Sequence, residues 1–225
     1  MAGTGVWRSP LIDARCPACQ DAFEKERAKE QQALARRNEL VELLGGEKPY
    51  REFTFERYQV TPGNQVAYQR CIEFNPTTEN LYLWGPCGVG KTHLAYAAAR
   101  RCLQETLSAT IQPAGQLTRK VRMKDPAQEQ TAIEQFVGVD VLILDDLGIG
   151  TDTAYGRQLV QEILDRRDFA NRAGLVVTSK YSLGGLAEKL QDDSIPSRLA
   201  GMCTVIQVQG ADARLRPKPS QYNLK

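Results

Sequence analysis

The residues from Gly85 to Thr92 have the types and spacing of a Walker A phosphate-binding loop. Glycine lets consecutive backbone N–H groups turn toward phosphate oxygens, and a helix that begins at the loop adds the positive end of its dipole. We expect Lys91 to reach the β and γ phosphates of ATP and the Thr92 hydroxyl to ligate magnesium. The predicted nucleotide-binding residues are Gly85, Pro86, Cys87, Gly88, Val89, Gly90, Lys91, Thr92 and His93.

A pair of acids follows the apolar run from Val141 to Leu144. A phosphate loop needs a carboxylate at the end of a neighbouring strand, and this run with Asp145 and Asp146 has the Walker B pattern. We expect Asp145 to hold magnesium through its water shell and Asp146 to orient or deprotonate the attacking water. Lys91 and Asp146 are thus candidate catalytic residues. Aspartate is shorter than the glutamate common in motor ATPases, so slow hydrolysis is expected.

Polar residues also end the apolar run from Leu175 to Val177, where Thr178, Ser179 and Lys180 follow. At the edge of the sheet where the γ phosphate should lie, they could sense that phosphate; the alternative is an ordinary Ser/Thr turn. Two single arginines, Arg198 and Arg214, have no motif of their own, and spacing alone would assign them to surface ion pairs.

Alternating strands and helices must position these residues. The pattern predicts a parallel five-stranded sheet with helices on both faces, which is the three-layer α/β core of a P-loop NTPase. A glycine stop and proline follow a charged helix near the start of the chain. The expected strands cover 81–84, 109–112, 139–144, 174–178 and 203–208; the expected helices cover 23–44, 65–74, 91–107, 116–123, 126–136, 153–170 and 186–190.

Composition limits the class of protein. The 225 residues suffice for one principal domain with an appendage, and 29 basic against 27 acidic residues give a net charge of +2. No overall field therefore indicates nucleic acid or a membrane surface. Nothing approaches the roughly 18 apolar residues of a membrane span, so a cytoplasmic location without a membrane partner is expected, with the six cysteines reduced.

Several of these motifs together resemble the DnaC/IstB group of AAA+ ATPases, which comprises helicase loaders and transposition helper ATPases. The resemblance runs from about Phe53 to Arg214, and it is carried by the segments 84–94, 142–148, 177–183 and 197–199. His93 and Leu94 after the phosphate loop, and Leu147 and Gly148 after the paired acids, are more specific than the general Walker pattern. The family implies an AAA+ fold with little or no C-terminal lid.

The family also implies roles for the two arginines and the sensor. Arg198 matches the arginine finger that reaches a neighbouring subunit's nucleotide, which implies a homo-oligomer and gives a third catalytic residue. Arg214 matches the second sensor arginine, which contacts the nucleotide in its own subunit. The family commonly has Thr-Ser-Asn at the first sensor, where this chain has Thr178, Ser179 and Lys180, and Lys180 could contact phosphate as a point charge.

The N-terminal region indicates partners. Cys16 and Cys19 look like half of a four-cysteine zinc ribbon, and without the other half zinc is not expected from this chain alone. The charged helix resembles the arm with which loaders grip the replicative helicase. A basic cluster suits a single-stranded DNA backbone and consists of Arg119, Lys120, Arg122 and Lys124. The expected parts are an arm at 1–49, an ATPase domain at 50–212 and a tail at 213–225.

Three functions remain open on the sequence. The first is a helicase loader that hydrolyses ATP. The second is an IstB-like transposition helper, and the third is a nucleotide-switched adaptor with little hydrolysis.

Overall fold

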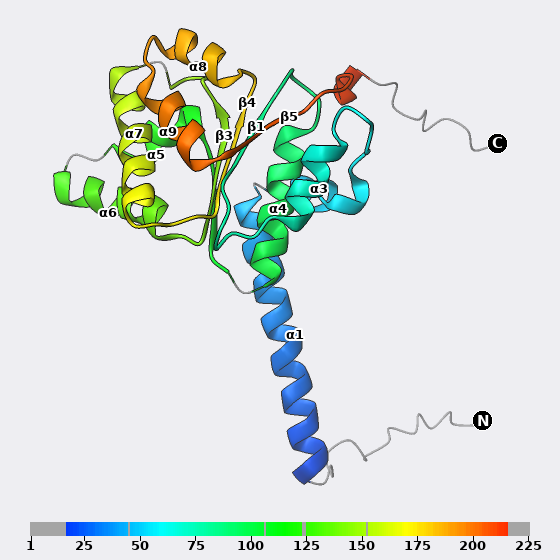
Figure 1. Ribbon diagram of the computed structural model, residues 1–225. Helices are drawn as coiled ribbons and strands as arrows, with labels where there is room; N and C mark the ends of the chain where they lie inside the picture. Colours follow the sequence, from blue (N-terminus) through cyan, green and yellow to red (C-terminus); the bar gives the residue numbers. More distant parts are fainter. Residues whose placement is uncertain (1–16, 45, 106, 123–124, 152, 216–225) are drawn as a thin grey trace, which may run out of the picture.

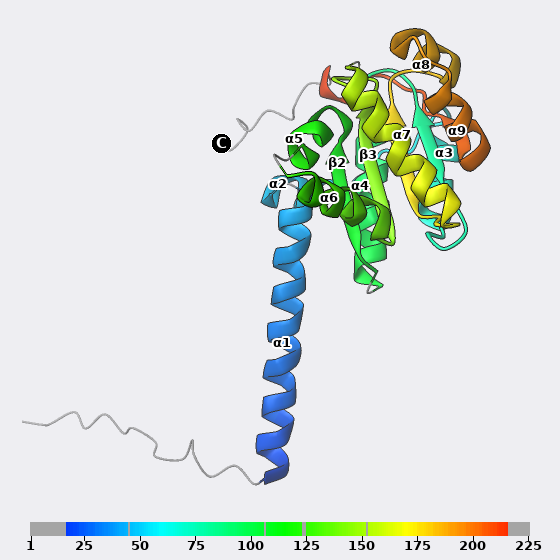
Figure 2. The same cartoon turned by 90° about the vertical axis from the view of Figure 1, so that its left-hand side faces the viewer.

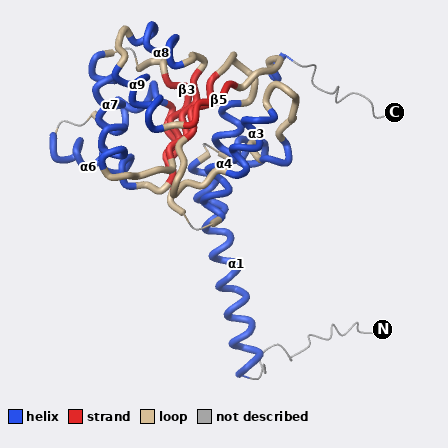
Figure 3. The backbone as a smooth tube through the Cα atoms, in the orientation of Figure 1, coloured by secondary structure: helices blue, strands red, loops and turns tan. Residues whose placement is uncertain are grey.

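A single parallel sheet forms the centre of the protein. The computed structural model describes residues 17–215 apart from 45, 106, 123–124 and 152. Five strands pair in the order β2-β3-β4-β1-β5, all parallel (Figures 1 and 3). Their bounds are β1 Leu81–Trp84, β2 Ala109–Pro113, β3 Val141–Leu147, β4 Leu175–Ser179 and β5 Thr204–Gln207. The predicted five-stranded parallel sheet is confirmed.

Helices cover both faces of the sheet, and side chains that alternate along each strand pack against one helical layer or the other. One face, with Leu83, Ile143 and Val176, packs under α3 (Gln65–Glu73) and α4 (Lys91–Gln104). The other face, with Leu144 and Val177, packs under a second group of helices. These are α5 Leu117–Val121, α6 Pro126–Gly138, α7 Ala154–Phe169, α8 Leu183–Leu190 and α9 Ser194–Met202. Figure 2 shows this second layer, and the predicted three-layer architecture is confirmed.

A buried arginine joins the second helical layer to the sheet. Arg167 of α7 has no exposed surface. Its guanidinium donates to the carbonyl oxygens of Phe136, Val137 and Val139 at the end of α6, and to that of Ala173 before β4, over 2.5–3.2 Å. Burial lowers the pKa of Arg167 to about 10, so it remains charged at neutral pH.

The helix α1 (Pro17–Leu43) projects from this core (Figures 1 and 2). All residues from 23 to 28 are exposed, whereas Leu40 and Leu44 at its other end are buried. An ion pair of 2.5 Å between Arg37 and Glu47 links α1 to α2 (Glu47–Glu52). The predicted boundary between arm and ATPase domain, after residue 49, lies inside α2. The domain boundaries stay a prediction.

Some elements differ from the prediction for local reasons. The sequence does not predict α2 or α9, because each segment contains a proline, a residue that interrupts helices. Pro49 and Pro196 lie in the first turn of their helices, where the N–H that proline lacks would have no helical partner anyway. The strand β3 begins later and extends through both acids. Three short 3-10 turns complete the described elements: η1 Phe55–Arg57, η2 Ala114–Gln116 and η3 Ala213–Leu215. Among the described helices, none is both long and apolar enough to cross a bilayer.

Candidate nucleotide site

The phosphate loop joins β1 to α4 at the carboxyl edge of the sheet. Gly88 and Gly90 have φ of 76° and 97°, in the left-handed region that favours glycine. Gly90 is also the residue before the first turn of α4. The Gly85 N–H donates to the Ser179 carbonyl over 3.2 Å, which ties the start of the loop to the end of β4. The predicted order of strand, glycine loop and helix is therefore present.

Lys91 lies inside the loop. Its ammonium donates to the carbonyls of Gly85 and Pro86, at 2.8 and 2.7 Å, and the residue is only 6% exposed. Burial lowers the pKa of Lys91, while nearby Cys87, Asp146 and Asp145 raise it in part. A cation held among loop carbonyls is placed to exchange those carbonyls for phosphate oxygens.

Thr92, Asp145 and Thr178 form a chain of hydrogen bonds between the loop and two strands. The Thr92 hydroxyl donates to Asp145 Oδ1 over 2.9 Å, and the Thr178 hydroxyl donates to the same oxygen over 2.6 Å. The Thr178 oxygen in turn accepts the N–H of Asp146 at 2.9 Å. Burial raises the pKa of Asp145, and the bond from Thr178 lowers it in part. The predicted pair of magnesium ligands, Thr92 and Asp145, is thus in direct contact.

Asp146 occupies an irregular point of β3. The pairing of β3 with β4 shifts between Leu144 and Leu147, and Asp146 has φ of 56°. A left-handed non-glycine residue is uncommon, and such strain is concentrated at functional sites. The bulge leaves Asp146 exposed beside buried Asp145, which suits a residue that acts on water.

At the polar end of β4, Thr178 is the residue that meets the paired acids, and the sensing of phosphate by Ser179 and Lys180 stays a prediction. Ser179 is buried, and its hydroxyl donates to the Leu147 carbonyl at 2.7 Å and accepts the Tyr181 N–H at 3.1 Å. The Lys180 ammonium lies 4.9 Å from the centroid of the Tyr181 ring, and among the described residues no hydrogen bond or ion pair joins its side chain to the phosphate loop. Alternation along the strand turns successive side chains to opposite faces, so Thr178 and Ser179 contact different groups.

The segment after β5 returns to the phosphate loop. The Ala213 N–H donates to the Gly88 carbonyl at 3.0 Å, and Arg214 pairs with the carboxylate of Asp212 at 3.1 Å. The hydrogen bonds that Arg214 donates to Asp212 raise the pKa of Arg214, with a smaller contribution from Cys87 in the loop. Arg214 therefore lies beside the loop, as its predicted contact with the nucleotide of its own subunit requires.

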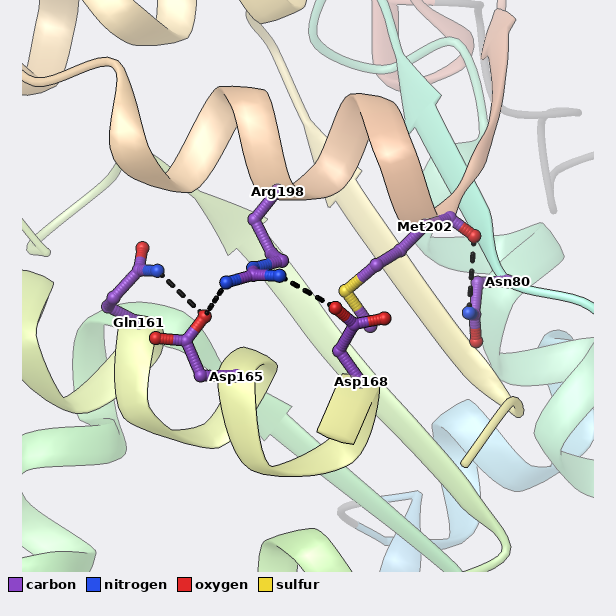
Figure 4. A network of polar contacts seen from close by, with 6 residues as sticks. All are labelled: Asn80, Gln161, Asp165, Asp168, Arg198 and Met202. Atoms are coloured by element: carbon purple, nitrogen blue, oxygen red, sulfur yellow. Dashed lines mark hydrogen bonds and ion pairs between the residues drawn. The ribbon is translucent and has the colours of Figure 1, made fainter. Parts of the chain in front are cut away.

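Arg198 lies on α9, in the second helical layer, and its side chain points toward acids of α7 (Figure 4). Its guanidinium pairs with Asp165 at 2.8 Å and with Asp168 at 2.7 Å, both on α7, and Gln161 donates to Asp165 at 2.9 Å. An open depression of about 510 Å³ surrounds these groups, with Ser194 and Ser197 on its wall. Both ion pairs found for Arg198 among the described residues are thus with its own α7, and its action on a neighbouring subunit stays a prediction.

Tyr58 and His93 make contacts near the loop that the sequence did not predict. The Tyr58 hydroxyl donates to the Val89 carbonyl at 3.2 Å, across 31 positions of sequence. His93, at the start of α4, donates from Nε2 to the Thr54 carbonyl at 2.7 Å. Burial lowers the pKa of His93. Nothing in the spacing of the aromatic residues before α3 points to the phosphate loop.

The predicted zinc ligands and the basic cluster are described only in part. Cys16 and Lys124 are outside the described residues, and Cys19 lies in α1. No group of three or more histidine, cysteine or acidic side chains in the described part of the chain could hold a metal ion. In the basic cluster, Arg119 and Lys120 are exposed on α5, and Arg122 lies 5.5 Å from the centroid of the Tyr155 ring.

The residues present fit a magnesium nucleotide. Left-handed glycines with an intervening residue form a concave run of N–H groups that accepts an anion. Lys91 supplies the buried positive charge, and Thr92 and Asp145 supply adjacent oxygens of the hard type that magnesium binds. When bound, magnesium neutralises charge on the β and γ phosphates.

The comparisons with known proteins agree with this geometry. The family model for IstB-like ATP binding protein matches residues 20–221. The replicative helicase loader DnaC of Escherichia coli is 25% identical over 173 residues, which are 70% of this chain and 71% of the relative. A protein of insertion sequence IS5376 from Geobacillus stearothermophilus, named for ATP binding, is 28% identical over 184 residues, or 77% and 72% of the two chains.

Solved structures share the fold. The crystal structure of the DnaC helicase loader has a TM-score of 0.62 at 23% identity, over 72% of this chain and all of that one. AMPPCP-bound DnaA from Aquifex aeolicus has a TM-score of 0.62 at 21% identity, over 70% of this chain, which spans half of the DnaA chain. The predicted AAA+ type of the fold is confirmed.

Proposed function

Because this chain belongs to the IstB-like ATP-binding family, we propose that it hydrolyses ATP and uses the nucleotide to load a ring-shaped replicative helicase onto single-stranded DNA. The observation that carries this proposal is the projecting helix α1 on an ATP-binding AAA+ core. The part of α1 that projects from the core is exposed and mostly polar, so packing against the core stabilises it little and its surface is available to a partner. Similarity to DnaC supports a helicase as that partner.

The residues of the site have distinct tasks in hydrolysis. Lys91 and the loop N–H groups hold the phosphates, and Thr92 and Asp145 hold magnesium directly or through water. Asp146 orients the water that attacks the γ phosphorus and accepts its proton as the bond to the bridging oxygen breaks, which yields ADP and phosphate. Thr178 keeps Asp145 and the backbone of Asp146 in register through its two hydrogen bonds.

Arg198 completes the site from a neighbouring subunit in this proposal. Its side chain is 39% exposed and lines the open depression between α7 and α9, where the nucleotide edge of a neighbouring subunit would dock. Mixing Asp146→Asn with Arg198→Ala subunits tests this assignment. One mixed interface then pairs an intact acid with an intact arginine, so the mixture should hydrolyse ATP faster than either variant alone. Arg198→Ala with wild-type turnover would remove the arginine from the mechanism.

A matched pair of variants on α1 tests the partner. Leu34 is 56% exposed on the arm, and Leu34→Asp should abolish helicase capture while leaving ATP affinity unchanged. Gln31→Asp adds the same charge at an exposed polar position of the same helix and should retain the partner. The measurement is co-purification of tagged protein from its native host. A hexameric helicase bound to wild type and Gln31→Asp, and lost from Leu34→Asp, supports the loader.

The IstB-like transposition helper is the second candidate. The family model and the 28% identity to the insertion-sequence protein favour it as directly as DnaC favours the loader. Recovery of a transposase in the same experiment, without a helicase, would contradict the loader and support this candidate. The adaptor with little hydrolysis is supported by Asp146, whose short side chain stands where many motor ATPases have glutamate. ATP binding without measurable phosphate release, with or without DNA and partner, would favour it.

A further inference from the structure

Two segments that are distant from the phosphate loop in sequence, one before α3 and one after β5, form hydrogen bonds with its backbone. Before α3, the Tyr58 hydroxyl donates to the Val89 carbonyl at 3.2 Å. After β5, the Ala213 N–H donates to the Gly88 carbonyl at 3.0 Å. Two consecutive carbonyls of the loop therefore have partners that do not belong to the loop. The first of these partners is a side chain, which mutation can remove.

The Val89 carbonyl determines the direction of the next N–H group. Peptide groups are planar, and no described peptide bond is cis, so the Gly90 N–H points opposite to the Val89 carbonyl. A carbonyl that faces Tyr58 therefore turns the Gly90 N–H toward the other side of the loop. That side is the concave one, since left-handed residues that alternate with right-handed ones direct their N–H groups inward.

Tyr58 is itself held firmly. The residue is 9% exposed, and its ring stacks on Tyr68 with centroids 5.6 Å apart and an angle of 15°. The edge of His93 meets it at 5.1 Å. A Cβ atom on Gly90 would lie 2.6 Å from Cε2 of Tyr58, so the ring is directly against the loop backbone. Burial raises the pKa of Tyr58, which keeps the phenol protonated as a donor.

We propose that Tyr58 is a positioning residue for phosphate binding: its hydroxyl holds the Val89–Gly90 peptide in the orientation in which the Gly90 N–H donates to a phosphate oxygen. The proposal rests on the proposed function only in that the loop binds the phosphates of ATP. Tyr58 acts through the loop and touches no catalytic group. It therefore sets the affinity for ATP and ADP alike, and its loss should raise KM for ATP by a larger factor than it lowers kcat.

Tyr58→Phe removes the hydroxyl and keeps the ring. Titration calorimetry with magnesium-ATP and magnesium-ADP should show binding about three- to tenfold weaker, the loss expected for one hydrogen bond to a buried carbonyl. Tyr68→Phe is the matched control, because Tyr68 belongs to the same stack and no hydrogen bond of its hydroxyl is found among the described residues. Its affinities should equal those of wild type. Without nucleotide, Tyr68→Phe should keep the wild-type melting temperature, and Tyr58→Phe should lose only about 2–4 °C, as one lost hydrogen bond predicts.

A second measurement observes the loop directly. In the wild type, the Gly90 amide resonance should shift strongly downfield when ATP binds, as expected for an N–H that donates to an anion, and in Tyr58→Phe the shift should be smaller. Three results would each overturn the proposal: wild-type nucleotide affinity in Tyr58→Phe, an equal loss of affinity in Tyr68→Phe, or a Gly90 amide shift in Tyr58→Phe as large as that in the wild type. Wild-type protein that does not bind ATP would instead contradict the proposed function, so the two failures are distinguishable.

Discussion

Thr178→Val tests the hydrogen-bond chain that joins the phosphate loop to the paired acids. Valine has the shape of threonine but can neither donate to Asp145 nor accept from Asp146. The lost bond to the carboxylate, 2.6 Å long, is of the charged type that contributes about 1.5–3 kcal/mol. The bond from the Asp146 N–H, 2.9 Å long, contributes roughly 1 kcal/mol more, and the added methyl group offsets part of the sum. We expect the free energy of unfolding to fall by about 2–3 kcal/mol.

Urea denaturation of the nucleotide-free protein measures this loss. Thr204→Val is the control, because Thr204 is exposed on β5 and the same substitution there should change stability by less than about 0.5 kcal/mol. Burial raises the pKa of Asp145 above 3.8, so the ionised carboxylate lowers the free energy of unfolding at neutral pH. This cost disappears as Asp145 is protonated at lower pH. The difference between Thr178→Val and wild type should therefore shrink as pH falls through that raised pKa. A loss no larger than that of Thr204→Val at pH 7 would refute the reasoning.

Two further predictions concern stability. Burial lowers the pKa of His93 below 6.5, so the unfolded chain binds a proton more readily than the folded chain does. The free energy of unfolding of the wild type should therefore fall as pH drops below about 6.5. This pH dependence should be weaker in His93→Gln, whose amide can still donate to the Thr54 carbonyl. Urea titrations from pH 8 to 5 check it, and identical slopes would contradict it. Arg167→Met should lower the free energy of unfolding by more than about 3 kcal/mol, because four buried carbonyls lose their donor. Arg166→Met, which breaks a surface ion pair with Glu162, should lower it by less than about 1 kcal/mol, and equal losses in the two variants would show that the buried contacts are not stabilising.

The phosphate loop and the paired acids could be predicted from sequence because their signals are local. Gly85 to Thr92 lie between a strand and a helix whose patterns are both clear, and the run before Asp145 is apolar without interruption. The order of elements then fixes the parallel sheet, since crossovers have one hand.

Contacts between distant segments could not be predicted in this way. Thr178 and Ser179 end β4 and Lys180 follows it. Which of them meets Asp145 depends on the pairing shift between Leu144 and Leu147, which no sequence pattern reveals. Tyr58 reads as one aromatic among several, and only the fold brings it to Val89. The helix that carries Arg198 was missed because Pro196 reads as a breaker, although it lies in the first turn.

Titration calorimetry with magnesium-ATP on wild type, Lys91→Ala and Lys120→Ala tests the central claim most directly. Lys91 is buried in the loop, whereas Lys120 is an exposed lysine of α5 and serves as the control. The account predicts that wild type and Lys120→Ala bind ATP with the same affinity and that Lys91→Ala, folded by circular dichroism, shows no binding. Wild-type affinity in Lys91→Ala would contradict it.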